Sequence, residues 1–308
     1  MIKILLVVGP TAVGKSALAL KIAQKFNGEI ISGDSMQIYR HLDIGTAKVI
    51  GSDRKKVKHY LIDICNVDQS YSAADFIKQS TAAVKQISVK QKLPMIVGGT
   101  GFYLQALLDG FQLGGVASTG QTAFREKMEL FAKQKGQIAL WDKLNNIDPA
   151  GAAKIPVGNQ RKIIRALEVY HLTGKAFSAQ HDLRSATFDP LVIGLNVARP
   201  LLYQRIDRRV DLMFKSGLLK ETAWLDQQGG EKLPAGKGIG YKELFPYFAG
   251  KSSLTAAVAL IKKNSRHYAK RQLTWFRNKM QVVWFDPSTA NFEQQVFDLI
   301  RNWLTSNN

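Results

Sequence analysis

The sequence predicts an α/β fold, in which a P-loop NTPase-like parallel sheet forms the core and an all-helical subdomain is inserted into it. Short apolar runs alternate with helix-like stretches along most of the chain, and glycines follow several of these runs. Strands that alternate with helices in this way are typical of parallel sheets. Between residues 114 and 186 the pattern becomes helical without a clear strand. We therefore expect a core of residues 1–113 and 187–308 around a helical insertion at 114–186.

The expected strands and helices can be assigned in chain order. Ile2–Val8 is a continuous apolar run, typical of a strand buried on both faces, and a helical pattern follows at Lys15–Phe26. Glu29–Ser32 and Pro94–Val97 predict two further strands, the second of which runs into a glycine-rich turn. The remaining expected elements are a strand at 191–197, long helices at 201–227 and 255–278, and a last strand at 282–285.

The composition is that of an ordinary globular protein with an unusual charge. The 308 residues are 45% hydrophobic and 22% charged, which excludes a disordered chain. Because 43 Lys and Arg outnumber 24 Asp and Glu, the net charge is +19. This excess favours a polyanionic partner, although a basic surface kept only for solubility is the alternative. A single cysteine, Cys65, excludes an internal disulfide and a multi-cysteine zinc site.

The beginning of the chain predicts a buried strand and not a targeting or membrane segment. Its apolar run is far shorter than a membrane span, and it leads directly into a glycine motif. We therefore expect a cytoplasmic protein that has no membrane partner.

Residues 9–16 match the P-loop pattern G-x-x-x-x-G-K-[ST] at every fixed position, between an expected strand and an expected helix. In such a loop, backbone N–H groups and the helix N-terminus surround phosphate oxygens, Lys15 reaches the terminal phosphate, and the Ser16 hydroxyl binds Mg²⁺. The motif is typical of ATP-binding proteins, and a tight turn containing Gly and Lys by chance is the alternative. The residues expected to bind phosphate are Gly9, Thr11, Ala12, Gly14, Lys15 and Ser16.

A carboxylate is expected beside this loop, but not where a simple nucleotide hydrolase would have one. Hydrolases commonly place an acidic Mg²⁺ ligand after a later buried strand, and the strand at 94–97 is followed by none. Asp34 instead follows the second strand, and the carboxyl ends of parallel strands meet at one edge of the sheet. Asp34 could there accept a proton from a nucleophile, or it could cap a helix N-terminus.

Ten segments together match one family in order and nearly over the whole chain, whereas a P-loop alone is common to dozens of families. The segments are 9–16, 34–39, 42–48, 59–63, 71–76, 98–103, 161–169, 205–211, 239–243 and 269–277. With these segments the chain resembles the bacterial tRNA dimethylallyltransferases, also called tRNA isopentenyltransferases.

The resemblance implies a reaction and a set of catalytic residues. Dimethylallyl diphosphate would occupy the P-loop, and the tRNA adenosine immediately 3′ of the anticodon would receive the five-carbon group on its exocyclic N6, releasing diphosphate. By this resemblance Asp34 takes the proton of the adenine amino group, Thr100 lies where the two substrates meet, and Arg205 binds diphosphate. Together with Lys15, the loop amides and Mg²⁺, Arg205 would neutralise charge developing on the leaving group.

The resemblance also implies contacts with the tRNA anticodon stem-loop, from which the target adenine must be flipped out. Ser35 and Gln37 match the family's contacts to the extruded base. Arg161 and Arg165 would share one helix face, which without the resemblance we would interpret as a solvated face. The residues expected to contact tRNA are Ser35, Met36, Gln37, Arg161, Lys162, Arg165, Lys237, Tyr241, Lys263, Arg266, Lys270 and Arg271.

Residues 251–279 form the most basic part of the chain, with eight Lys or Arg and no acidic residue. Their spacing stacks several cations on one helical face, while Tyr268 and Phe276 fall on another face that would pack against the sheet. Like charges repel on an isolated helix, so this arrangement favours binding to phosphates. A membrane-surface helix is the alternative, and it would need a broad apolar face. The stacked cations are Lys263, Arg266, Lys270 and Arg277.

The chain departs from the family pattern mainly where tRNA contacts are expected. Gly158–Gln160 replaces the usual Asp-Pro, His267 stands where glutamine is usual, and the segment 113–121 lacks its usual proline and acid. Lys237 stands where arginine is common, and lysine cannot form the same bidentate hydrogen bonds.

Two other classes of function remain open on the sequence. A small-molecule P-loop kinase would have no use for the basic helix, and a non-enzymatic RNA-binding protein would not need an intact P-loop beside a carboxylate. We expect the protein to act as a monomer.

Overall fold

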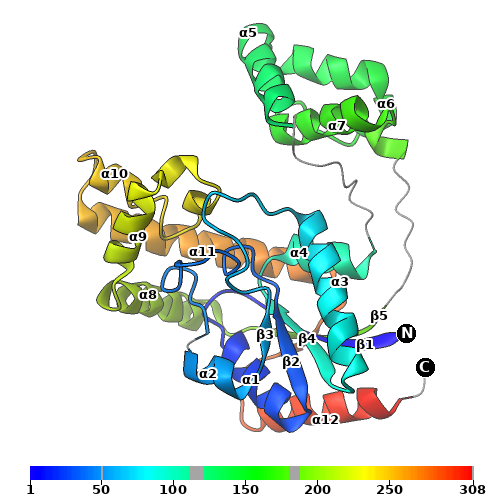
Figure 1. Ribbon diagram of the computed structural model, residues 1–308, viewed down its shortest axis with the longest axis vertical. Helices are drawn as coiled ribbons and strands as arrows, with labels where there is room; N and C mark the ends of the chain where they lie inside the picture. The colour runs from blue at the N-terminus through cyan, green and yellow to red at the C-terminus, as the bar shows by residue number, and fades with distance from the viewer. Residues whose placement is uncertain (50, 111–120, 180–187, 307–308) are drawn as a thin grey trace. The chain divides into compact units, whose positions relative to one another are not determined.

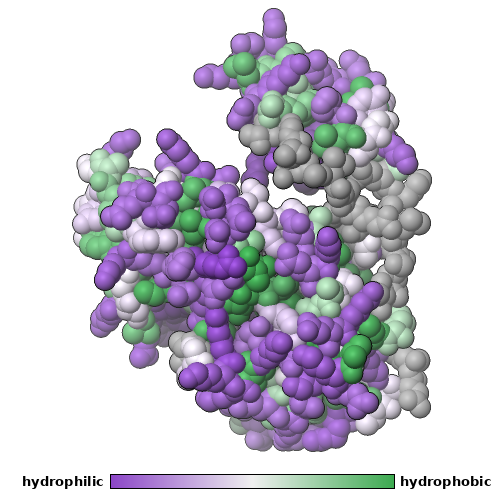
Figure 2. Space-filling view, viewed as in Figure 1, coloured by the Kyte–Doolittle hydropathy of each residue, from purple (hydrophilic) through white to green (hydrophobic). Residues whose placement is uncertain are grey.

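The computed structural model describes residues 1–49, 51–110, 121–179 and 188–306 (Figure 1). The chain divides into two compact units, Met1–Asp109 with Ala186–Asn308, and Gly110–Ser185. The domain boundaries expected at residues 113–114 and 186–187 lie outside the described residues. Among the helices of the described ranges, none has the length and apolar character needed to cross a membrane. Hydrophilic residues cover most of the visible face of the first unit (Figure 2).

A six-stranded parallel sheet forms the centre of the first unit, and it confirms the predicted α/β class. The strands lie in the order β3-β2-β4-β1-β5-β6. Their bounds are β1 Ile2–Val8, β2 Gly28–Ser32, β3 His59–Tyr60, β4 Leu93–Gly98, β5 Phe188–Leu195 and β6 Val283–Phe285. The two-residue strand β3 is too short to give a periodic signal, and the sequence analysis missed it.

Both faces of the sheet are covered, as the continuous apolar run of β1 predicted. Leu5 and Val7 lie in one core with α1 and α12, while Ile4 and Leu6 point to the other face, covered by α3 and α4 (Figure 1). The helices on these faces are α1 Lys15–Lys25, α3 Ala73–Val89, α4 Gly101–Leu108 and α12 Phe292–Thr305. The carboxyl ends of β1, β2 and β4 therefore remain accessible at one edge of the sheet.

The long helix expected at 201–227 is two helices, because Gly217 has φ 106° and ends the first of them. α8 spans Arg199–Lys215 and α9 spans Leu218–Gln227. The basic helix α11 is a single helix, Leu254–Lys279, and it contributes Ala269 and Phe276 to the two cores of the sheet. The short elements of this unit are α2 Gly51–Lys56, α10 Phe245–Phe248, and the 3₁₀ turns Gly230–Lys232 and Ala235–Lys237.

All regular elements among the described residues of the second unit are helices. Its helices are α5 Gln121–Ile147, α6 Pro149–Ala152 and α7 Gln160–Thr173, followed by a 3₁₀ turn at Phe177–Ala179. They enclose a small core of their own. Glu168 of α7 is fully buried in this unit, and its carboxylate lies 2.7 Å from Arg125 Nε and 2.6 Å from Arg165 Nη1.

Candidate active site

The P-loop connects β1 to α1 and has the backbone geometry that phosphate binding requires. Gly9 and Gly14 have φ angles of 140° and 109°, which favour glycine. Lys15 Nζ donates to the carbonyl oxygens of Gly9 at 3.0 Å and Pro10 at 2.7 Å. Ser16 is the second residue of α1 and is exposed. Loop N–H groups and the helix N-terminus thus form a site suited to an anion.

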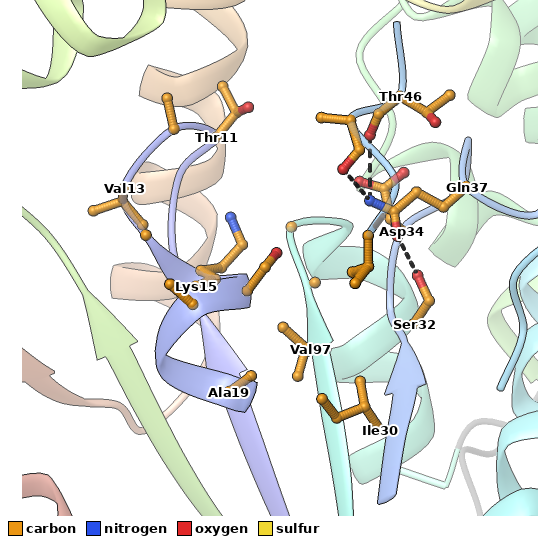
Figure 3. Close-up of a pocket in the computed structure, with 18 of the residues that line it drawn as sticks. Thr11, Val13, Lys15, Ala19, Ile30, Ser32, Asp34, Gln37, Thr46 and Val97 are labelled. Atoms are coloured by element: carbon orange, nitrogen blue, oxygen red, sulfur yellow. Dashed lines mark hydrogen bonds between the residues drawn. The ribbon is translucent and has the colours of Figure 1, made fainter. Parts of the chain in front are cut away.

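A cavity of about 460 Å³, which we call the P-loop cavity, lies beside this loop. Lys15 points into it from the beginning of α1, and Asp34 faces it from the end of β2 (Figure 3). Ile30 and Val97 form an apolar part of its wall (Figure 3). Its polar lining includes Thr11, Lys15, Ser16, Ser32, Asp34, Gln37, Arg209, Tyr268 and Gln272. The structure therefore brings the phosphate loop and the carboxylate together in one cavity.

The arginine at this cavity is Arg209 and not Arg205, which corrects the assignment made from the sequence. Arg209 lines the cavity, and its Nη1 donates to Thr11 Oγ1 at 3.4 Å. Arg205 lies one turn earlier on α8 and lines neither this cavity nor the one that adjoins it on the side of Ser35. Hydrogen bonds from Ser288 and, to a lesser extent, the charge of Arg205 lower the pKa of Asp286, so Arg205 lies toward the end of β6.

Two half-buried cations, Lys15 and Arg209, face this cavity. Burial, reinforced by the charge of Arg209, lowers the pKa of Lys15 to about 7, while Asp34 acts in the opposite direction. Burial also lowers the pKa of Arg209, again opposed by Asp34. A lowered pKa means that the charged form of a basic group is disfavoured in the cavity. An anion that enters the same cavity stabilises this charged form.

Asp34 lies in a turn that is joined to the glycine-rich turn after β4. Its Oδ1 accepts from the backbone N–H of Met36 at 2.8 Å, so the carboxylate caps a turn and not a helix. The N–H of Ser35 donates to Thr100 Oγ1 at 3.1 Å. Gly98 permits this approach, since a Cβ there would lie 2.2 Å from the carbonyl oxygen of the residue before Asp34. Thr100 supports the Asp34 turn without lining the P-loop cavity.

The amide of Gln37 is used in contacts with neighbouring loops. Its Oε1 accepts from Ser32 Oγ at 3.0 Å, and its Nε2 donates to the carbonyl oxygens of Thr46 at 3.2 Å and Ala47 at 3.4 Å (Figure 3). Gln37 therefore lines the cavity while it fixes the loop around Thr46. A contact between Gln37 and a base, as expected from the sequence, would have to compete with these hydrogen bonds.

A second cavity of about 330 Å³ adjoins the P-loop cavity. Ser35, Met36, Lys237 and Arg271 line it. Because six residues line both cavities, the two spaces meet beside Asp34. The shared residues are Thr11, Ala12, Asp34, Thr46, Arg209 and Tyr268.

Two polar side chains of α11 at this site were not predicted from the sequence. Tyr268 was expected to pack against the sheet, but it lines both cavities, and burial raises its pKa to about 12. Gln272, one turn later, is 5% exposed and lines the P-loop cavity. The signal available in the sequence was a pair of polar residues four apart on the apolar face of a helix.

The structure contradicts one of the expected tRNA contacts and limits another. Tyr241 is 1% exposed, and its hydroxyl donates to Glu221 Oε1 at 2.7 Å, so it is part of the core and cannot contact RNA. The expectation failed because a tyrosine in a glycine-rich segment can be buried as readily as exposed. Arg266 Nη1 lies 2.6 Å from Asp207 Oδ1 on α8, which engages this cation within the protein.

The other residues expected to contact tRNA lie in two groups. Lys237, Lys263, Lys270 and Arg271 are exposed on the first unit. In the second unit Arg161 and Lys162 are exposed at the beginning of α7, and Arg165 is paired with the buried Glu168.

The described residues contain no cluster of three or more His, Cys, Asp or Glu side chains that could hold a metal ion. The oxygen ligands that line the P-loop cavity include the Ser16 hydroxyl and the Asp34 carboxylate. This set suits Mg²⁺, which commonly binds through one or two protein oxygens together with substrate phosphates and water.

Comparison with known proteins identifies the family. A sequence model described as IPP transferase matches residues 37–279. The chain is 52% identical to a tRNA dimethylallyltransferase of Ligilactobacillus salivarius, with 98% of this chain and 99% of the relative covered. It is 50% identical to the corresponding protein of Enterococcus faecalis, covering 99% and 98% of the two chains.

Solved structures agree with this result. The crystal structure of a tRNA isopentenylpyrophosphate transferase from Bacillus halodurans is similar with a TM-score of 0.74 and 41% identity, covering 99% of this chain and 97% of that one. A eukaryotic dimethylallyltransferase acting on tRNA has a TM-score of 0.84 and 27% identity, with 100% of this chain and 81% of the other covered. By sequence and by structure, this chain belongs to the IPP transferase family.

Proposed function

We propose that this protein transfers a dimethylallyl group from dimethylallyl diphosphate to the exocyclic N6 of the tRNA adenosine immediately 3′ of the anticodon. The observation that supports this most directly is the P-loop cavity, in which two half-buried cations, Lys15 and Arg209, share a space with the carboxylate of Asp34. Such a transfer requires cations that stabilise an anionic leaving group and a group that accepts a proton.

In this reaction the bond between the allylic carbon and the diphosphate oxygen breaks, and a bond between that carbon and N6 forms. Lys15, Arg209 and the P-loop N–H groups stabilise the negative charge of the departing diphosphate. The Asp34 carboxylate accepts the proton that N6 loses. Thr100 orients the Asp34 turn through its hydrogen bond with the Ser35 N–H.

We propose that Ser16 contributes its hydroxyl to a Mg²⁺ ion that enters with the diphosphate. When bound, this ion adds positive charge at the leaving group. Asp34 remains available as proton acceptor, because a diphosphate and water can supply the other ligands.

The tRNA anticodon stem-loop is the partner that we propose for the second cavity and for the exposed cations of α11. The flipped adenine would enter beside Ser35 and Met36, where the two cavities meet. Lys237, Lys263, Lys270 and Arg271 are exposed and suited to phosphate contacts. We further expect the protein to act as a monomer in the cytoplasm.

The test is a transfer assay with isotopically labelled dimethylallyl diphosphate and unmodified tRNA, with γ-labelled ATP as a competing donor in a parallel reaction. Label from the prenyl donor should enter tRNA, and nucleoside analysis should place it on N6 of the adenosine 3′ of the anticodon. Transfer of phosphate from ATP in place of the prenyl group would refute the proposal.

A further inference from the structure

Gln272 of α11 connects the two turns that form opposite sides of the proposed reaction site. Its Oε1 accepts from the N–H of Thr11 in the P-loop at 2.9 Å. Its Nε2 donates to the carbonyl oxygen of Gly99, in the turn after β4, at 3.0 Å. The amide oxygen of Gln272 therefore bonds to the loop that contains Lys15, and its amide nitrogen bonds to the turn that contains Thr100.

The fit around this amide is close. Gln272 is 5% exposed, and a Cβ on Gly99 would lie 2.1 Å from its Nε2. The backbone of the glycine turn can thus approach the amide only because residue 99 has no side chain. Tyr268, one turn earlier on α11, lines the P-loop cavity together with Gln272.

Gln272 differs from the core residues of α11 in the groups that it contacts. Ala269 and Phe276 of the same helix are packed within the cores of the sheet, so they already fix α11. Gln272 instead contacts backbone groups of the P-loop and of the turn next to Asp34 and Ser35. The distance between the leaving-group site and the proton acceptor depends on these two turns.

We propose that Gln272 is a positioning residue that sets the P-loop and the Thr100 turn at the separation required for prenyl transfer. This inference rests on the proposed function. Each substrate can still bind its own turn when the amide is lost, but the reacting atoms would no longer be aligned. A misalignment of about 1 Å can lower the rate about 10²-fold.

The first test replaces Gln272 with leucine, which is of similar size and has no polar atoms. Gln272→Leu should lower kcat about 10²-fold, while the KM values for dimethylallyl diphosphate and tRNA and the affinity for inorganic diphosphate change less than threefold. The matched control is Gln105→Leu on α4, since among the described residues the Gln105 amide bonds only to Asp109 of the same helical segment. The control should retain wild-type kcat.

The second test uses Gln272→Glu, and it remains informative if the leucine variant does not fold. An ionised carboxylate can accept from Thr11 but cannot donate to Gly99, whereas a protonated carboxyl can do both. The ratio of variant to wild-type kcat should therefore rise as pH falls. The titratable groups that line the cavity with Gln272 are Lys15, Asp34, His59, Arg209 and Tyr268. A negative charge at position 272 would raise the pKa of Lys15, and this effect alone would make the ratio rise with pH, which is opposite to the expected trend.

The outcomes separate the two proposals. If wild-type protein transfers no prenyl group, the proposed function fails, and the positioning role fails with it. If the wild type is active but Gln272→Leu keeps kcat within threefold, or raises only one KM, the positioning role is wrong and the function stands. A pH-independent ratio for Gln272→Glu would also overturn the positioning role.

Discussion

Arg209 and Arg205 lie one turn apart on α8, and exchanging each for glutamine tests which of them binds the diphosphate. Four residues of helix separate them by about 6 Å along the axis, and only Arg209 lines the P-loop cavity. A hydrogen bond from a charged group contributes about 1.5–3 kcal/mol, which corresponds to about 10- to 150-fold in rate. Arg209→Gln should lower kcat/KM for dimethylallyl diphosphate by this factor, with the KM for tRNA unchanged. Arg205→Gln should remain within threefold of the wild type.

We also expect Arg209→Gln to change the pH dependence of kcat/KM for dimethylallyl diphosphate. The charge of Arg209 helps burial to lower the pKa of Lys15 to about 7, and only the protonated amine can neutralise a diphosphate. In the wild type, kcat/KM for dimethylallyl diphosphate should fall as pH rises above about 7. Removing the charge of Arg209 raises the pKa of Lys15, so this decline should begin at higher pH in Arg209→Gln.

Steady-state kinetics with labelled dimethylallyl diphosphate between pH 6 and pH 9, at saturating tRNA, measure both effects. The reasoning would be refuted if Arg205→Gln lost as much activity as Arg209→Gln. An unchanged alkaline limb in Arg209→Gln would show that Arg209 does not act on Lys15.

Three further predictions concern other parts of the first unit. Asp34→Asn should abolish turnover while gel-shift affinity for tRNA remains within a few fold; near-normal turnover would exclude proton transfer to this carboxylate. Tyr241→Phe leaves a hydrogen bond of the half-buried Glu221 unmade, so chemical denaturation should show a loss of about 1–3 kcal/mol, with tRNA affinity unchanged. Replacing Lys263 and Lys270 together with glutamine should reduce the slope of log affinity against log salt by about 1.5; an identical slope would place the RNA elsewhere.

Local patterns in the sequence were sufficient for five of the six strands of the described sheet and for the phosphate loop. The continuous apolar run of β1 predicted a strand covered on both faces, and Leu5 and Ile4 do point into two different cores. The spacing of Gly9, Gly14 and Lys15 predicted the P-loop, because its conformation depends on residues that are adjacent in the chain. Asp34 could be placed beside that loop, since strand ends of a parallel sheet meet at one edge.

The sequence by itself determined the family, five of the six strands of the described sheet, and the two loops that contain Lys15 and Asp34. Tertiary structure alone decided which side chains of the later helices reach those loops. Arg205 and Arg209 share one helix face, and only the place where α8 passes the P-loop puts Arg209 at the cavity. Tyr268 and Gln272 likewise reach the site because packing fixes the rotation of α11, a long-range property that residue spacing within the helix does not contain.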